Sequence, residues 1–305
     1  MNVLITGGAG YLGVVLSKAL LDKGCPVTIL DNFIYGESSI LHLMEYPGFD
    51  VIREDLRNIN GRSLARFDVI YHLAGISGYP ACEANPNSAQ LINVDATRQL
   101  TGKLSRDQIL IYASTTSFYG MNGDRCDEDS HVAPVSLYGK TKYQGEQIVM
   151  QKENSIALRF ATIFGVSPKM RVDLLVNDFT CKAINDRCIV LFAGDSKRTF
   201  VHIKDAIRAY IFAMEHAEDT RNKVFNVGDE RLNYSKIEIA ETISGLTGCK
   251  VIKSDMDDLD VRNFEISFEK IRALGYSVQH TLMEGIQELI RLYTFYKPFL
   301  PYKPI

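Results

Sequence analysis

The chain has 305 residues, a formal charge of −3 at pH 7 and a sequence pI of about 6.1. This length permits one large domain with a smaller lobe, and the scattered lysines and arginines form no basic stripe for a nucleic-acid backbone. Six cysteines without a C-x-x-C pair predict neither a disulfide framework nor a zinc site, so no metal is expected.

The sequence contains no run of about 18 apolar residues of the kind that crosses a membrane. The apolar run Val3–Ile5 is followed at once by glycines and is too short for a signal peptide. We therefore expect a cytoplasmic protein that has neither a membrane nor a nucleic acid as its partner.

Short apolar runs alternate with helical patterns in the first half of the chain, which is typical of a parallel sheet covered on both faces. Strands are expected at Met1–Thr6, Val27–Leu30, Val51–Ile52, Val69–His72, Ile109–Ala113 and Ile156–Phe160. The clearest helices between them are Val14–Lys23, Ser88–Leu104 and Tyr138–Lys152. The last two are apolar on more than one face, which hints at a subunit contact in a homodimer.

The strict alternation ends after Gly165, where a mixed pattern begins. Helices are expected at Asp173–Asn185, Asp205–His216, Tyr234–Gly245 and Thr281–Thr294, and strands near Ile189–Phe192 and Thr199–His202. The predicted fold is α/β, a Rossmann-type doubly wound parallel sheet with a smaller mixed α/β substrate lobe. Residues 1–165 would form the dinucleotide-binding domain and 166–305 mainly the lobe, with about 199–228 returning to the first domain.

A glycine-rich turn lies directly after the first predicted strand and opens a helix. Gly7 allows the tight turn, Gly10 lets the backbone approach a pyrophosphate, and Gly13 permits close packing of helix on strand. Asp31 ends the second strand, where its carboxylate can accept hydrogen bonds from ribose hydroxyls and would repel a 2′-phosphate. The pattern favours NAD over NADP.

Tyr138 and Lys142 are four residues apart, so they share one helix face. A tyrosine can act as a base near pH 7 only if about 4 kcal/mol of preferential stabilisation favours its phenolate. A neighbouring ammonium and a cationic nicotinamide could supply it in a dry cleft, with the phenolate taking a proton from a sugar hydroxyl. A hydroxyl-rich segment, Ser114–Gly120, follows the fifth strand at the edge where open α/β sheets bind ligands.

At these motifs the chain resembles the extended short-chain dehydrogenase/reductase family, in its NAD-dependent epimerase/dehydratase group, which includes UDP-glucose 4-epimerase. The resemblance spans nearly the whole chain. The matching segments, in family order, are Thr6–Gly13, Leu30–Asn32, Glu54–Asn58, His72–Gly75, Ile92–Leu100, Ser114–Gly120, Tyr138–Lys142, Leu158–Gly165, Arg198–Ala206 and Phe225–Gly228.

The resemblance implies a catalytic triad of Thr115, Tyr138 and Lys142, with NAD as cofactor and a nucleotide-diphosphate sugar as substrate. The implied cofactor-binding residues are Gly7, Gly10, Tyr11, Leu12, Gly13, Asp31, Asn32, Asp55, Leu56, Leu73, Ala74, Asn93, Tyr138 and Lys142. The implied substrate-binding residues are Thr115, Thr162, Asn177, Arg198 and Arg262. Asn93 could instead be an ordinary residue of a helix start, and the two arginines could be surface ion-pair partners.

Departures from the family pattern restrict the reaction and leave the sugar open. Thr116 and Ser117 occupy the positions where sugar 4,6-dehydratases carry an Asp-Glu pair, so that elimination mechanism lacks its acid and base. Ala161 and Thr162 replace the aromatic-Asn pair usual in UDP-galactose epimerases, and the loop Ile76–Cys82 also differs. The segment Ala161–Thr180 looks like a subgroup that includes C4 dehydrogenases of GDP-linked heptoses.

The leading hypothesis is an NAD-dependent nucleotide-sugar epimerase that acts through transient oxidation at sugar C4. An alternative is a nucleotide-sugar 4-dehydrogenase or reductase with a net change in NADH, for example on a GDP-linked sugar. A non-catalytic NAD-binding sensor is the third reading. Sensors of this kind typically lose the tyrosine or the lysine, and this chain keeps both.

Overall fold

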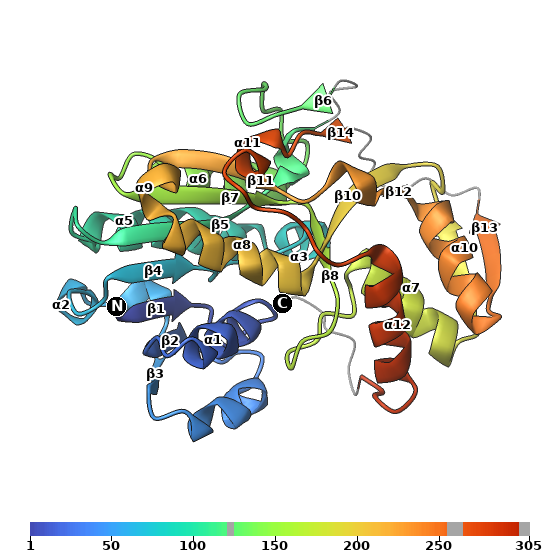
Figure 1. The fold of residues 1–305 in the computed structure, drawn as a ribbon, viewed down its shortest axis with the longest axis horizontal. Coiled ribbons are helices and arrows are strands. Elements are labelled where there is room, and N and C mark those ends of the chain that lie inside the picture. The colour runs from blue at the N-terminus through green and yellow to red at the C-terminus, as the bar shows by residue number, and fades with distance from the viewer. Residues whose placement is uncertain (121–124, 255–264, 299–305) are drawn as a thin grey trace.

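The computed structural model describes residues 1–120, 125–254 and 265–298, and its centre is a seven-stranded parallel sheet (Figure 1). The strand order is β11-β7-β5-β4-β1-β2-β3. The strands are β1 (Val3–Thr6), β2 (Val27–Asp31), β3 (Phe49–Arg53), β4 (Val69–His72), β5 (Ile109–Thr115), β7 (Ser155–Phe160) and β11 (Lys223–Val227). This arrangement confirms the predicted Rossmann-type fold.

Helices cover both faces of this sheet because neighbouring strand residues point to opposite sides. On one face, Val3 and Ile5 of β1 join the core that includes α1 (Gly13–Asp22) and α8 (Ile203–Glu215). On the other, Leu4 joins a second core with α5 (Thr97–Lys103) and α6 (Leu137–Val149). Burial on both faces explains why these strands read as continuous apolar runs.

Smaller sheets lie outside the main sheet. A three-stranded sheet has the order β12-β10-β8, and two-stranded sheets pair β13 with β9 and β14 with β6. Their strands are β6 (Arg125–Cys126), β8 (Thr162–Phe164), β9 (Cys188–Phe192), β10 (Lys197–His202), β12 (Asn233–Ser235), β13 (Lys250–Ser254) and β14 (Glu265–Ile266). The lobe helices α7 (Leu175–Asn185), α10 (Lys236–Thr247) and α12 (Leu282–Tyr293) lie together at one end of the molecule (Figure 1).

Short helical turns connect the larger elements. They are η1 (Ser38–Glu45), η2 (Leu56–Asn58), α2 (Gly61–Leu64), α3 (Tyr79–Ala84), α4 (Pro86–Gln90), η3 (Leu91–Ala96), η4 (Thr116–Phe118), α9 (Ala217–Thr220), η5 (Glu230–Leu232) and α11 (Glu269–Arg272). Within the part of the chain that is described, no helix is long and apolar enough to cross a membrane.

Several features differ from the predicted elements. The helix expected at Ser88–Leu104 is three successive helical segments, and its middle segment, η3, is a turn of π-helix. The pattern also missed β11, which pairs along its full length with β7 and closes one edge of the main sheet. Residues 199–228 divide between the two parts, because β10 pairs with β8 and β12, whereas α8 and β11 pack on the main sheet.

Candidate active site

A cavity of about 650 Å³ opens where β1, β4, β5 and β7 end, which is the edge predicted to bind ligands. The residues expected to bind cofactor or substrate that line it are Gly7, Gly10, Tyr11, Leu12, Gly13, Asp31, Asn32, Asp55, Leu56, Leu73, Ala74, Thr115, Tyr138, Lys142, Thr162 and Arg198. The fold therefore brings together most of these positions, from segments far apart in the sequence.

The glycine-rich turn has no room for a side chain at Gly7, Gly8 or Gly13. Gly7 has a φ of +70°, and a Cβ there would lie 2.8 Å from the backbone of Ala74. A Cβ on Gly13 would lie 2.5 Å from the carbonyl oxygen of Gly7. The turn thus forms a bare backbone cradle at the start of α1, and such a cradle fits the pyrophosphate of a dinucleotide.

Asp31 is hydrogen-bonded to the glycine-rich turn. Its carboxylate accepts hydrogen bonds from the backbone N–H groups of Ala9 (3.0 Å) and Phe33 (2.8 Å), and burial raises its pKa. Next to it, Asn32 donates to Asp55 at 3.2 Å. The hydrogen-bonded Arg57 guanidinium holds the pKa of Asp55 well below its usual range, so that carboxylate stays ionised.

The three residues of the expected triad come from β5 and α6. Thr115 ends β5, where its hydroxyl accepts from the N–H of Ser117 (3.1 Å) and donates to the Ser117 hydroxyl (2.9 Å). Ser136 caps α6 through the N–H of Gly139, which sets the helix start directly before Tyr138. Lys142 lies one turn further along, with its Nζ 4.1 Å from the centre of the Tyr112 ring.

Lys142 is a strongly perturbed cation of the cavity. Its side chain is almost fully buried, and this desolvation lowers its pKa to about 7 despite the opposing effect of Glu146. A lysine with a pKa near neutrality exchanges its proton readily under physiological conditions. Together with Tyr138, which also lines the cavity, it forms a pair able to move a proton.

The side chain of Asn93 is buried outside the cavity lining. Its amide accepts from the N–H of Ile76 (2.8 Å) and donates to the Ile76 carbonyl (3.0 Å) and the Thr141 hydroxyl (3.1 Å). Asn93 lies in the π-helical turn η3, so it fastens the loop after β4 to α6. These contacts suit a residue that positions the site rather than one that touches a ligand.

Asn177 also lies outside the residues that line the cavity. It is fully buried, accepts from the N–H of Gly165 (3.0 Å) and donates to the carbonyl oxygen of Arg171 (2.8 Å). Its amide therefore shapes the segment between β8 and α7. Arg171, which this segment carries, lines the cavity, forms an ion pair with Asp173 and donates to the Ser77 carbonyl at 3.3 Å.

Sequence reasoning missed Arg171 and Asp173 as cavity residues. Neither belongs to a periodic pattern, and the partner Ser77 is 94 residues away along the chain. Asp178 of α7 also lines the cavity, and burial raises its pKa. The only sequence signal was the subgroup segment Ala161–Thr180, which contains all three of these charged residues.

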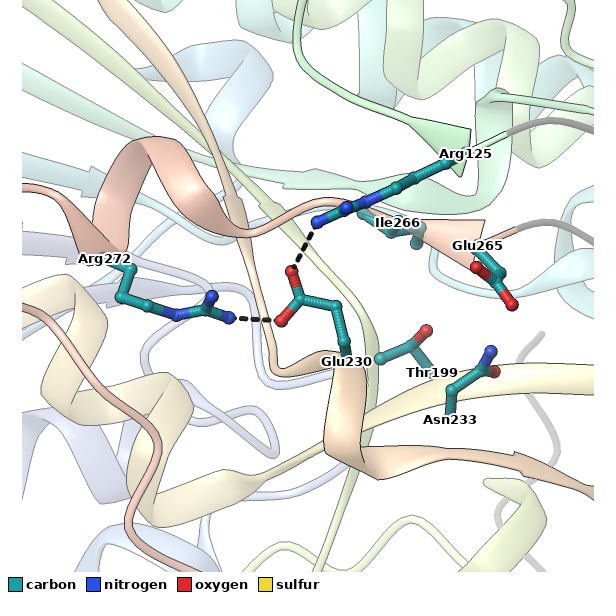
Figure 2. A pocket seen from close by; sticks show the side chains of 7 residues that line it. All are labelled: Arg125, Thr199, Glu230, Asn233, Glu265, Ile266 and Arg272. Carbon is teal, nitrogen blue, oxygen red and sulfur yellow. Dashed lines mark hydrogen bonds and ion pairs between the residues drawn. The ribbon is translucent and has the colours of Figure 1, made fainter.

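Of the two arginines expected to bind the diphosphate, one lies on the cavity wall and the other falls outside the described residues. Arg198 on β10 lines the cavity, whereas Arg262 lies outside the described residues. Thr199, the residue after Arg198, lines a second hollow of about 370 Å³. Figure 2 shows that Glu230 lies between Arg125 and Arg272 there and pairs with both.

The segment after β8 closes over the glycine-rich turn. The Tyr11 hydroxyl donates to the Gly165 carbonyl (2.8 Å), and the Ser167 hydroxyl donates to the Tyr11 carbonyl (2.8 Å). Lys169 reaches further, to the carbonyl oxygen of Tyr35. The two parts of the molecule thus share the wall of one cavity.

The model of the NAD dependent epimerase/dehydratase family matches residues 3–228, well over half of the sequence. The chain belongs to this family. It is therefore an enzyme of a family whose cofactor is NAD, and the resemblance read from the motifs is confirmed.

Curated relatives carry the names of nucleotide-sugar enzymes. UDP-glucuronate 4-epimerase 2 of Arabidopsis thaliana is 27% identical over 97% of this chain and 76% of its own length. The uncharacterized UDP-glucose epimerase YtcB of Bacillus subtilis (strain 168) is 30% identical over 80% of this chain and 83% of its own. UDP-glucuronic acid decarboxylase 1 of Danio rerio is 25% identical over 96% of this chain and 72% of its own.

A solved structure has the same overall fold. The UDP-glucuronic acid 4-epimerase from Bacillus cereus, in complex with UDP-glucuronic acid and NAD, superposes with a TM-score of 0.86 at 26% identity. The match covers 96% of this chain and 99% of the other. The similarity therefore includes both the main sheet and the second lobe.

Proposed function

We propose that this protein is an NAD-dependent nucleotide-sugar 4-epimerase. The observation that carries the proposal is the meeting of Thr115, Tyr138 and Lys142 with the glycine-rich cradle in one cavity. The 4-epimerases among its relatives and structural neighbours support the same reaction. They favour it over a 4-dehydrogenase with net NADH change.

The cradle of Gly7, Gly10 and Gly13 would hold the pyrophosphate, and Asp31 the adenosine ribose. When bound, NAD supplies a reversible hydride acceptor for the sugar carbon. Tyr138 takes the proton of the C4 hydroxyl, while Lys142 stabilises the phenolate and would hold the nicotinamide ribose. The Thr115 hydroxyl hydrogen-bonds the reacting sugar oxygen, so the same residues serve when the proton is returned.

The substrate lobe would bind the diphosphate and orient the sugar. A planar guanidinium suits phosphate geometry, and Arg198 is placed on the cavity wall for this role, with Arg262 as the second expected arginine. Thr162 would contact the sugar, and Asn177 would act by holding the segment that carries Arg171. We propose a UDP-sugar as the substrate, because UDP-sugars recur in the names of the relatives and structural neighbours.

We also propose a homodimer formed through α5 and α6. These two helices lie side by side on one face of the main sheet. Leu91, the first residue of η3, and Val135, two residues before α6, are apolar side chains that are 44% and 58% exposed. Light scattering after size exclusion should give twice the chain mass, and a monomer at micromolar concentration would contradict this state.

Replacement of Tyr138 by phenylalanine should abolish turnover, because it removes the only hydroxyl proposed to take the proton. The expected loss in kcat is on the order of a thousandfold. The measurement is proton NMR of protein, NAD and a panel of UDP-, GDP-, CDP- and dTDP-sugars, beginning with UDP-glucuronate and UDP-glucose. Residual activity within tenfold of the unsubstituted enzyme would refute the assigned base.

The same spectra separate the possible reactions. A new C4 epimer without accumulation of NADH supports the epimerase. A keto-sugar with an equal amount of NADH identifies a dehydrogenase instead. If no sugar changes and none stabilises the protein beyond NAD alone, the proposed reaction on these nucleotide sugars is refuted, and the sensor becomes the favoured alternative.

A further inference from the structure

A buried ion pair lies directly behind the proton-transfer residues. Glu146 follows Lys142 by one turn of α6, as Lys142 follows Tyr138, so all three share a face. The carboxylate of Glu146 is fully buried and bonds to both the Nε and a terminal nitrogen of Arg159, the shortest of these contacts being 2.7 Å. A buried charge of this kind is costly unless it is paired, so its place next to the site calls for a reason.

The second partner of Glu146 is Ser114, the residue before Thr115, whose hydroxyl is proposed to bind the reacting sugar oxygen. The Ser114 hydroxyl donates to the Glu146 carboxylate at 2.6 Å. Ser114 precedes Thr115 on β5 and lies opposite Arg159 of β7 in the sheet register. The carboxylate thus joins the ends of two strands to the helix that carries Tyr138.

Arg159 is itself held in one position. It donates to the Tyr119 hydroxyl (2.7 Å) and the Glu128 carbonyl (3.1 Å), and its guanidinium lies 5.0 Å from the centre of the Phe118 ring. Its guanidinium forms the ion pair with Glu146 described above. If the carboxylate lost its charge, the Arg159 cation would lose this counter-ion.

We propose, on the basis of the proposed function, that Glu146 is a positioning residue for the reaction, which fixes Thr115 through Ser114 and balances Arg159 behind Lys142. It touches neither the sugar nor the cofactor and acts through these neighbours. The role assigned to it is electrostatic as well as geometric. Its loss should therefore change how the activity depends on pH.

The direction of that change follows from the groups around Lys142. They come from four elements: Tyr138 and Glu146 on α6, Cys82 on α3, Tyr112 on β5 and His72 on β4. Burial holds the pKa of His72 at about 3 and raises that of Cys82 to about 11, so neither carries charge near pH 7. Glu146 is then the nearby anion that opposes the desolvation of Lys142.

Glu146→Gln keeps the size of the side chain and removes its charge. The site becomes more positive, so every deprotonation of the Tyr138–Lys142 pair becomes easier. We expect both limbs of the pH profile of kcat to move to lower pH by roughly one unit, with activity on the alkaline side falling about tenfold. Glu146→Asp keeps the charge, so it should lower kcat through altered geometry and leave the limbs in place.

Glu128→Gln provides the matched control. The Glu128 carboxylate also feels the charge of Arg159, but it accepts its hydrogen bond from the N–H of Asn226 at 2.7 Å, away from Lys142. Its pH profile should be unchanged. The proposal is overturned if Glu146→Gln and Glu146→Asp lower kcat equally at every pH, because a purely structural role predicts that result.

A second readout keeps this test separate from the identity of the substrate. Calorimetry of NAD binding between about pH 5 and 9 should show the same acidward shift in Glu146→Gln, since Lys142 is assigned to the nicotinamide ribose. If the enzyme turns over no nucleotide sugar, the proposed function fails, whereas this binding profile still decides the role of Glu146. Should Glu146→Gln not fold, Ser114→Ala tests the link to Thr115: kcat should fall about tenfold with unchanged limbs, and unchanged kcat would refute it.

Discussion

Gly7 shows how one absent side chain can decide whether a cofactor site exists. Its φ of +70° is open to glycine and rare for other residues, and the backbone of Ala74 lies where a Cβ would point. Gly24 has a similar φ, +78°, but nothing lies within 4 Å of its virtual Cβ. An alanine at Gly24 would therefore introduce backbone strain alone, whereas an alanine at Gly7 would add a steric clash with Ala74.

Gly7→Ala should weaken NAD binding by more than about tenfold, because the new methyl group pushes the turn away from the loop after β4. Gly24→Ala should cost about 1 kcal/mol of unfolding free energy through the same φ and leave NAD affinity intact. Calorimetric titration and urea denaturation measure the two effects. Equal NAD affinity in both variants would show that the close approach to Ala74 does not matter.

Individual residues of the cavity wall could be predicted where a local motif carried them. Gly7, Asp31, Tyr138 and Lys142 belong to short patterns whose geometry a strand end or a helix turn dictates. Arg171 could not be predicted in this way, because its place on the cavity wall depends on Asn177 and on a loop from another part of the chain. Tertiary contacts, and not propensity, put it there.

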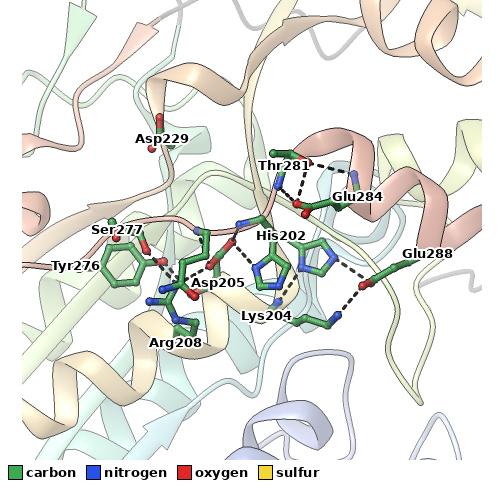
Figure 3. A network of polar contacts seen from close by, with 12 residues as sticks. His202, Lys204, Asp205, Arg208, Asp229, Tyr276, Ser277, Thr281, Glu284 and Glu288 are labelled. Carbon is green, nitrogen blue, oxygen red and sulfur yellow. Dashed lines mark hydrogen bonds and ion pairs between the residues drawn. The ribbon is translucent and has the colours of Figure 1, made fainter.

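At the scale of elements, a buried carboxylate on α8 holds the chain that leads into α12. Asp205 accepts hydrogen bonds from the N–H groups of Gln279 (3.0 Å) and His280 (2.9 Å), from the His280 ring (3.0 Å) and from Arg208 (2.9 Å). Figure 3 shows this cluster between the two helices, with His202 pairing to Glu288 beside it. The contact orders a segment that has little regular structure of its own.

Asp205→Ala should lower the unfolding free energy by about 1–3 kcal/mol, since it leaves the N–H groups of Gln279 and His280 without their acceptor and removes the Arg208 ion pair. Thermal denaturation followed by circular dichroism measures the loss. The control is Arg291→Ala on the exposed side of α12, where a change within about 0.5 kcal/mol is expected. A loss of similar size in both variants would contradict the role given to Asp205.

The order of the main-sheet strands along the chain could be predicted from the sequence, whereas one of these strands and the type of one helical segment could not. Alternating apolar runs gave the strands β1, β2, β4, β5 and β7 within two residues of their observed bounds, because both of their faces are buried. The strand β11 was missed; its five residues follow the short helix α9 after two residues. The π-helical turn η3 was also missed, because periodicity does not distinguish it from the α-helices on either side.

For the whole molecule, the cavity makes stability depend on the cofactor. A dinucleotide that contacts both the glycine-rich turn and the opposite wall binds the folded chain alone. NAD at 100 times its dissociation constant should raise the unfolding free energy by about 2.7 kcal/mol. NADP at the same concentration should give much less, because its 2′-phosphate would meet the carboxylate of Asp31. Thermal shift assays compare them, and equal shifts would refute the assigned selectivity.

The hydrogen bonds of Tyr11, Ser167 and Lys169 constrain how this enzyme could exchange parts with its relatives. A chimaera joined at the end of the main sheet's sixth strand, β7, would combine a foreign segment after β8 with the native glycine-rich turn. The foreign segment would then have to form these hydrogen bonds with a glycine-rich turn that comes from a different protein. Recombination that alters sugar preference while keeping the cofactor should therefore retain residues 165–169 with the dinucleotide-binding part and vary the lobe beyond them.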